Sequence, residues 1–277
     1  MDRIKILISG IPGKVGVNLA GHFLADGRFS LLPLALTGPG VPEEPASVAG
    51  ASIDIVGPER HREALANLLK SEGGFIVIDY SHPSAVNANA ALYCDLGINF
   101  VMGTTGGDRA ELNRTVEKSA SCAVIAPNMA KPIVGFTAMM EYMAENFPGL
   151  FSGYDLSIRE SHQAGKADTS GTAKAMVGYF NKMGVDFSAD RIFSERDPEI
   201  QRTGWGIPEE HLKGHGWHTY DLTSPDKTVK LSFTHNISGR DVYYPGTADA
   251  AIFLARRVAE GNRGRVYSML DVLKQAQ

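Results

Sequence analysis

The first half of the chain alternates short apolar runs with amphipathic segments. A β-prone run from Ile4 to Ser9 ends at Gly10, and apolar residues then recur at helical spacing from Val15 to Leu24. The alternation continues to residue 126, and it predicts strands near 30–36, 75–79, 99–102 and 123–126, with helices near 60–69, 84–96 and 109–119. Strands that alternate with helices indicate parallel βαβ units in an α/β, Rossmann-like, doubly wound parallel sheet.

The pattern changes after Pro132. We predict, in order, a long apolar helix to about 147, a strand near 154–160, a helix near 170–183, strands near 191–194, 217–222 and 229–234, and a helix near 247–260. Consecutive strands without helices between them are typical of a mixed sheet in a second α+β domain. We therefore divide the chain into residues 1–127, residues 128–240, and a segment 241–277 that returns to the first domain.

Composition and charge exclude several classes of partner. The formal net charge is -4, so no strongly basic surface is expected to attract nucleic acid or an anionic membrane. No apolar stretch reaches the ~18 residues that a membrane span needs, and the chain opens without signal or transit composition. Cys94 and Cys122 suggest buried thiols in a reducing compartment. We expect a cytoplasmic protein, or one of the plastid stroma if a transit peptide has been removed.

The glycines after the first strand predict a dinucleotide site. Glycine there permits a tight turn and lets the backbone approach a pyrophosphate, while the N–H groups of the following helix face the phosphates. A plain strand-to-helix turn is the alternative, but the position between a strand and a helix near the start of the chain favours the cofactor. The candidate cofactor-binding residues of this loop are Gly10, Ile11, Pro12, Gly13, Lys14, Val15 and Gly16.

The end of the second strand bears on which cofactor is used. An NAD site usually has Asp or Glu there to bind the ribose hydroxyls. This chain has Thr37 followed by Gly38 and Pro39, so no carboxylate repels a 2′-phosphate, and Lys14 offers a cation. We therefore expect NADPH to be used at least as well as NADH, with a preference for NADPH.

Small and polar residues follow three later strands, where open α/β sheets bind their ligands. Each of these stretches has a second interpretation as an ordinary turn. His82 precedes Pro83 and is as compatible with a turn as with a contact to the nicotinamide ribose. The further candidate cofactor-binding residues are His82, Gly103, Thr104, Thr105, Ala126, Pro127, Asn128 and Met129.

The segment from Glu160 to Thr172 is dense in reactive groups. His162 can exchange a proton near neutral pH, and Lys166 is a fixed cation. Ser170, Gly171 and Thr172 supply hydroxyls and the free N–H groups of a helix N-terminus, which suit a carboxylate. Together these groups predict an anion site with a proton donor. The alternative is a polar loop in which Ser170 caps the helix and His162 is solvated.

At these residues the chain resembles the 4-hydroxy-tetrahydrodipicolinate reductase (dihydrodipicolinate reductase) family. The glycine loop, the run Gly103-Thr104-Thr105-Gly106, Asn128 and the segment from Glu160 to Ala173 follow the family's order and spacing. The resemblance implies that a nicotinamide cofactor reduces a dehydrated cyclic imine dicarboxylate to tetrahydrodipicolinate, in the diaminopimelate route of lysine biosynthesis. It also implies that the first domain binds the dinucleotide and that the second binds substrate and forms the oligomer.

The resemblance assigns roles residue by residue. It makes His162 and Lys166 the catalytic groups, and Gly171 with Thr172 a carboxylate clamp, with Ser170 beside them. Gln163 replaces a second histidine of many bacterial members; it can still bind a substrate carboxylate but cannot hold charge. With Gln163 at this position, the chain resembles the plant-type branch of the family. The oligomeric state stays open between a homodimer and a homotetramer. Arg240, where the chain returns to the first domain, is a further candidate for contact with the cofactor.

Three other interpretations fit parts of the sequence. His211, His215 and His218 invite a metal site, but no cysteine joins them, and Pro208 and nearby glycines favour a loop, so we expect no metal there. A different two-domain dehydrogenase and a noncatalytic dinucleotide sensor are the remaining alternatives. A sensor would keep its function when His162 and Lys166 are replaced, whereas an enzyme would lose most of its turnover.

Overall fold

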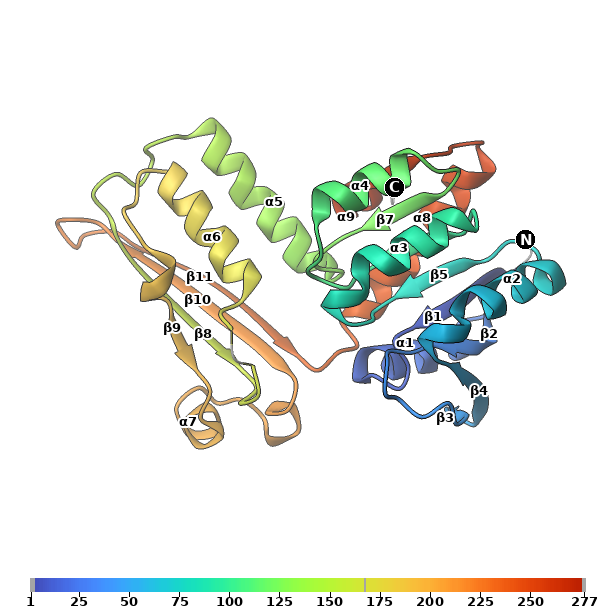
Figure 1. Ribbon diagram of the computed structural model, residues 1–277. Helices are drawn as coiled ribbons and strands as arrows, with labels where there is room; N and C mark the ends of the chain where they lie inside the picture. Colours follow the sequence, from blue (N-terminus) through green and yellow to red (C-terminus); the bar gives the residue numbers. More distant parts are fainter. Residues whose placement is uncertain (1–2, 167, 276–277) are drawn as a thin grey trace. The chain divides into compact units, whose positions relative to one another are not determined.

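The computed structural model describes residues 3–166 and 168–275 and divides the chain into two compact units. Unit 1 consists of residues 1–131 together with 241–277, and unit 2 of residues 132–240. The division after residue 131 lies a few residues beyond the boundary expected from the sequence, and the one after residue 240 coincides with it. Unit 1 is therefore built from two separate stretches of chain (Figure 1).

Unit 1 is an α/β unit around one eight-stranded sheet of order β12-β7-β6-β5-β1-β2-β4-β3. All neighbouring strands in it are parallel except the antiparallel pair β3 and β4. Its strands are β1 (Ile4–Ser9), β2 (Phe29–Leu36), β3 (Ala46–Val48), β4 (Ala51–Val56), β5 (Ile76–Asp79), β6 (Asn99–Met102), β7 (Cys122–Ile125) and β12 (Arg265–Tyr267). The strand order reverses between β1 and β5, and ligands bind at such a reversal in open α/β sheets.

Helices pack on this sheet and bury its strands. They are α1 (Lys14–Ala25), α2 (His61–Glu72), α3 (Val86–Asp95), α4 (Arg109–Glu117), α8 (Tyr243–Ala259) and α9 (Met269–Lys274), with 3-10 turns η1 (Pro58–Arg60) and η2 (Pro83–Ala85). Central strands covered on both faces read as continuous apolar runs, and Ile6, Leu7 and Ile8 are indeed fully buried. The expected doubly wound parallel sheet is confirmed.

Unit 2 contains a four-stranded mixed sheet of order β11-β10-β8-β9. Its strands are β8 (Asp155–His162), β9 (Phe193–Glu195), β10 (His215–Thr223) and β11 (Lys230–Ser238), and its helices are α5 (Lys131–Asn146), α6 (Gly171–Lys182) and α7 (Pro198–Thr203), with 3-10 turns η3 (Ala189–Arg191) and η4 (Glu209–His211). Met140 of α5 and Phe180 of α6 share a buried cluster with Tyr220 of β10, so both helices pack on one face of this sheet (Figure 1). The second α+β domain expected from the sequence is confirmed.

Short elements account for most of what the sequence analysis missed. It did not predict β3, β4, β12, α7 or α9, each of which has six residues or fewer. The β4 signal was present, because Ile53 and Ile55 alternate with polar residues and are buried. Of the helices that the structure describes, none is long and apolar enough to cross a membrane.

Gly246 provides a test of how closely α8 packs within unit 1. A Cβ atom there would collide with the carbonyl oxygen of Met129, whereas one on Gly21 of α1 would meet nothing within 4 Å. We expect Gly246→Ala to destabilise the protein by about 1–3 kcal/mol, the usual cost of overpacking. The matched variant Gly21→Ala should be neutral or stabilising by up to about 1 kcal/mol. Urea unfolding of the two variants checks this, and equal midpoints would contradict it.

Candidate active site

The glycine loop is shaped by contacts that leave no room for side chains. A Cβ on Gly13 or Gly16 would lie 2.6 or 2.7 Å from the carbonyl oxygen of Gly10. Gly10 itself has φ 115° and rests against the backbone of Tyr80, at the end of the neighbouring strand β5. No side chain caps α1, so the N–H groups of its first turn stay available to a ligand. The loop therefore has the form that a pyrophosphate requires.

The end of β2 carries no acidic residue. Thr37 is buried, and its N–H donates to the carbonyl oxygen of Val56 at the end of β4, 3.0 Å away. A Cβ on the following Gly38 would meet nothing within 4 Å, so the space beside this strand end is open. Glu43 pairs with Arg60, the last residue of η1 after β4, and the sequence analysis did not single out this cation.

Asp79, at the end of β5, holds the neighbouring loops in place. Its carboxylate is fully buried and accepts hydrogen bonds from Asn89 (2.9 Å), Tyr93 (2.8 Å), Ser81 (2.7 Å) and Thr104 (2.9 Å). A buried carboxylate needs such partners, because removing it from water is costly. The hydroxyl of Thr104 is thereby committed to Asp79, so this residue can offer a cofactor mainly its backbone. The sequence analysis missed Asp79, whose role depends on side chains from three different elements.

Several of the other candidate cofactor residues make hydrogen bonds within the fold or are buried in it. Nδ1 of His82 accepts a hydrogen bond from the N–H of Ser84, so His82 caps η2, as the turn interpretation expected. Oδ1 of Asn128 accepts from the N–H of Ala130 (2.8 Å). Ala126 and Met129 are buried, which leaves their backbone as the part available to a ligand.

The candidate chemistry lies in unit 2, where β8 ends and α6 begins. The N–H of Lys166 donates to the carbonyl oxygen of Gln163 (3.0 Å) and forms a turn directly after β8. Ala167 lies outside the described residues. Ser170 is the N-cap residue of α6, but its side chain makes no capping hydrogen bond. The alternative in which Ser170 caps the helix with its hydroxyl is therefore wrong, and the first-turn N–H groups of α6 stay available.

The side chain of Lys166 is half-buried beside this turn. Its ammonium group forms an ion pair with Asp168 (2.6 Å), whose side chain is mostly exposed. The hydrogen bond from Lys166 lowers the pKa of Asp168. An exposed ion pair contributes little energy, so an anionic ligand can displace Asp168 at small cost.

His162 is the last residue of β8 and faces a cluster of polar side chains. Its Nδ1 lies 3.1 Å from the carbonyl oxygen of His215, which can only accept, so Nδ1 carries a proton. Its Nε2 lies 3.3 Å from Nε2 of His218 and 3.9 Å from Oε2 of Glu160. The two imidazole rings meet edge to face at 74°. The interpretation of His162 as a solvated side chain is wrong, because only 13% of it is exposed.

Glu160 is the buried anion of this cluster. Oε1 pairs with Arg196 (2.6 Å), and Oε2 accepts from the N–H of Ser170 (3.1 Å). Burial opposes ionisation of Glu160, but its contacts with His218 and Arg196 outweigh that cost and lower its pKa to about 2. Burial, followed by repulsion from His218, lowers the pKa of His162 to about 4. At neutral pH the cluster therefore holds an ionised carboxylate beside a neutral imidazole.

Arg196 is a positioning residue that the sequence analysis missed. Besides Glu160, it donates to the carbonyl oxygen of Lys166 (3.0 Å) and to that of Glu195 (2.8 Å). It thus connects the end of β9 to the turn that carries Lys166. Nothing in the sequence distinguishes it, because it stands in an ordinary charged run between Glu195 and Asp197.

The histidines of residues 211–218 are arranged differently from the expectation. His215 and His218 both lie on β10. The expected loop is wrong for His215, whereas His218 falls within the strand expected near 217–222. Nε2 of His215 bonds to Ser161 (2.9 Å), whereas His218 is the direct cross-strand partner of Glu160. The three histidines do not converge on one point. Instead, His218 joins Glu160 and His162.

The remaining candidates occupy the same unit without joining the cluster. Arg240, the last residue of unit 2, donates to the carbonyl oxygen of Lys213 (3.3 Å). Gln163 supplies its carbonyl oxygen to the turn at Lys166. The first-turn residues Gly171 and Thr172 begin α6, and a Cβ on Gly171 would meet nothing within 4 Å.

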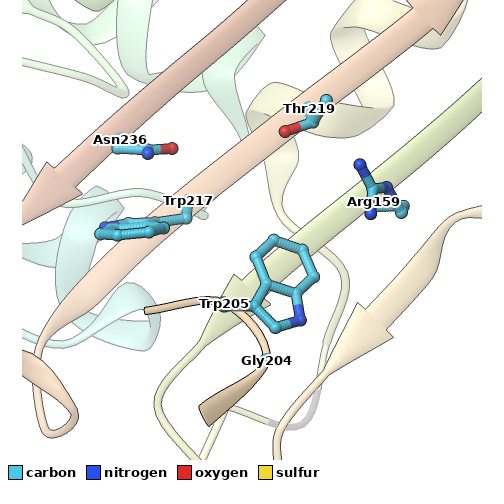
Figure 2. Close-up of a pocket in the computed structure, with 6 residues that line it drawn as sticks. All are labelled: Arg159, Gly204, Trp205, Trp217, Thr219 and Asn236. Carbon is cyan, nitrogen blue, oxygen red and sulfur yellow. The ribbon is translucent and has the colours of Figure 1, made fainter. Parts of the chain in front are cut away.

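A separate hollow of about 250 Å³ lies on the sheet of unit 2. Figure 2 shows the indole rings of Trp205 and Trp217 beside it, with Arg159 on β8 next to them. Thr219 and Asn236 complete the wall from β10 and β11. Arg159 and Glu160 are successive residues of a strand, so they point to opposite faces of the sheet. The hollow is therefore on the face away from Glu160, and none of the candidate site residues lines it.

Comparisons with known proteins agree along almost the whole chain. The family described as "Dihydrodipicolinate reductase, N-terminus" matches residues 4–129, and "Dihydrodipicolinate reductase, C-terminus" matches residues 133–273. A probable 4-hydroxy-tetrahydrodipicolinate reductase 1, chloroplastic, of Oryza sativa subsp. japonica is 47% identical over 98% of this chain and 78% of its own length. The chloroplastic reductase 1 of Arabidopsis thaliana is 45% identical over 99% of this chain and 79% of its own.

More distant proteins share the fold. The 4-hydroxy-tetrahydrodipicolinate reductase of Aromatoleum aromaticum is 28% identical over 99% of this chain and 96% of its own. A solved structure, the dipicolinate-bound dihydrodipicolinate reductase from Paenisporosarcina sp. TG-14, superposes with a TM-score of 0.65 at 18% identity and covers 96% of this chain and 98% of that one. The chain therefore belongs to the dihydrodipicolinate reductase family.

Proposed function

We propose that this chain is a 4-hydroxy-tetrahydrodipicolinate reductase, which uses NAD(P)H to reduce a dehydrated cyclic imine dicarboxylate to tetrahydrodipicolinate. Family membership and the names of the curated relatives support this reaction. The single observation that carries it is the arrangement at the end of β8. His162 ends the strand, Lys166 lies in the turn that follows, and α6 then begins without a side-chain cap. A proton-exchanging group beside two anion-binding groups suits a dicarboxylate that takes up a proton with its hydride.

The residues of unit 2 divide this work between binding and proton transfer. Lys166 would bind one carboxylate in place of Asp168, and the N–H groups of Gly171 and Thr172 would bind the other at the helix N-terminus. Ser170 and Gln163 stand on either side of these groups as further substrate contacts. His162 would exchange the proton, and Lys166 would draw electron density from the imine.

The first unit would hold the nicotinamide cofactor. The first-turn N–H groups of α1 and the tight glycine loop suit its pyrophosphate, and the loops after β5, β6 and β7 lie at the carboxyl ends of the parallel strands where such cofactors bind. We propose a preference for NADPH, supported by the open space at Gly38, the absence of a carboxylate at Thr37 and the cation Lys14. The bound cofactor supplies the hydride.

The location and assembly of the chain are proposed on separate grounds. The plant relatives are named chloroplastic, which agrees with the second of the two locations expected from the sequence, the plastid stroma. For assembly we propose a homo-oligomer that associates through the sheet face bearing Trp205 and Trp217. Phe193 is 53% exposed and pairs in register with Arg159 on this face, so aromatic area is open to a second copy.

Replacing the two proposed catalytic residues tests the reaction. We expect His162→Gln and Lys166→Met each to lower kcat/KM with the cyclic imine dicarboxylate about 10²- to 10⁴-fold, because each removes one proton-transfer or charge-stabilising group. Binding of NADPH, followed by its fluorescence, should stay unchanged. The control His211→Gln, outside the cluster, should keep its activity. Wild-type protein that oxidises neither NADPH nor NADH with this substrate would refute the function.

The cofactor preference is tested at Gly38. Gly38→Asp places a carboxylate at the end of β2 without a steric clash, and we expect it to lower kcat/KM for NADPH about tenfold or more, because the carboxylate repels the 2′-phosphate. The efficiency with NADH should change little. Gly38→Asn has nearly the same shape without the charge and serves as control. A wild-type enzyme that strongly prefers NADH would contradict the proposal.

The assembly surface is tested by removing its indole rings. We expect the double variant Trp205→Ser, Trp217→Ser to shift the protein to a smaller species in sedimentation, because it removes the large apolar anchors of this face. Tyr142→Ser, which removes another exposed ring from α5 of the same unit, should leave the assembly unchanged. A wild-type monomer, or an assembly unaffected by the double variant, would count against this surface.

A further inference from the structure

Three potential metal ligands converge beside the proposed proton donor. Nε2 of His162 lies 3.3 Å from Nε2 of His218, and Oε2 of Glu160 lies 3.6 Å from Nε2 of His218 and 3.9 Å from Nε2 of His162. The three residues come from the adjacent strands β8 and β10, with Glu160 and His218 in direct register. Strand pairing therefore fixes this triangle of donor atoms.

The size of the triangle matches what a small metal ion requires. Zinc binds imidazole nitrogen and carboxylate oxygen at about 2.0–2.1 Å with tetrahedral geometry, which places neighbouring donors about 3.4 Å apart. The three measured separations lie around that value, and all three ligands can face one point. Three protein ligands leave a fourth position open, and the partly exposed side of His162 gives solvent access to it.

The surrounding groups already orient two of the three ligands. Nδ1 of His162 donates to the carbonyl oxygen of His215, which leaves the lone pair on Nε2 directed at the cluster. Oε1 of Glu160 is held by Arg196, and Oε2 by the N–H of Ser170, so the carboxylate cannot rotate freely. Nδ1 of His218 is buried and has no hydrogen-bond partner among the described residues, so its ring can take either tautomer.

Burial and charge indicate which ion fits. Glu160 is fully buried and only 4% of the His218 side chain is exposed, so competing water is scarce. Two imidazole nitrogens and one carboxylate suit Zn²⁺ rather than Mg²⁺ or Ca²⁺, which prefer sets of oxygen ligands. Arg196 shares the charge of the carboxylate, so the affinity should be lower than that of a closed four-ligand site.

We propose that Glu160, His162 and His218 bind one Zn²⁺ ion and that the bound ion inhibits the enzyme by occupying Nε2 of His162. Only the second half rests on the proposed function, because inhibition requires His162 to serve the reaction. The competing explanation is a hydrogen-bonded cluster in which Nε2–H of His218 donates to Nε2 of His162 and no metal binds. The two explanations predict different effects of Zn²⁺ on this protein.

Binding is tested by calorimetric titration of chelator-treated protein with Zn²⁺, and by the visible absorption that Co²⁺ acquires in a tetrahedral site. We expect one ion per chain. His218→Gln and Glu160→Gln should each weaken binding about tenfold or more. His211→Gln, which changes a histidine of the same unit outside the triangle, should bind as the wild type does. Circular dichroism checks that each variant is folded. No saturable binding, or equal affinity in wild type and folded His218→Gln, would overturn the proposal.

Inhibition is measured with NADPH and the cyclic imine dicarboxylate. We expect Zn²⁺ to inhibit reversibly, EDTA to restore activity, and Mg²⁺ to have no effect at the same concentration. In His218→Gln, the Zn²⁺ concentration that halves the variant's own activity should rise about tenfold or more. Binding without inhibition would refute the inhibitory role. Zn²⁺ binding in a protein that lacks any reductase activity would instead refute the proposed function and leave the metal site standing.

Discussion

The ion pair between Glu160 and Arg196 is the interaction on which the candidate site depends. A buried carboxylate is costly unless it is paired and hydrogen-bonded, and here Arg196, Ser170 and Ser194 all donate to the carboxylate of Glu160. It joins β8 to the end of β9, to Ser194 and to the first residue before α6. Removing either charge would leave the other buried and unpaired, at a cost of about 3–5 kcal/mol. The turn that bears Lys166 is held by the same guanidinium.

Unit 1 uses a buried carboxylate in a comparable way. Asp79 ends β5 and gathers hydroxyl and amide groups from the loops and the helix around it. In both units the acid stands at or near the end of a strand, and some of its partners lie in the segments that follow strands. A rigid sheet therefore sets the positions of loops whose own sequences, rich in glycine and threonine, would not hold one shape.

The sequence predicted the fold class and the chemical segment because both are local signals. Glycines between a strand and a helix, and a dense run from Glu160 to Thr172, can be recognised without knowing which strands pair. The approach of His218 to Glu160 could not be predicted, because it depends on the register between β8 and β10, which are far apart in sequence. Arg196 was missed for the same reason. Thr104 was given a cofactor role, whereas its hydroxyl serves Asp79, a contact that only the folded loop reveals.

The division of unit 1 into two stretches of chain has a consequence for how the protein is made. Unit 2 is one continuous segment, complete when residue 240 has been synthesised. The sheet of unit 1 begins with β1 but gains its edge strand β12 only from the last residues, where Arg265 pairs with Cys122 of β7. On the ribosome, unit 2 can close its core first, while the N-terminal strands wait for α8 and β12 to cover and complete them.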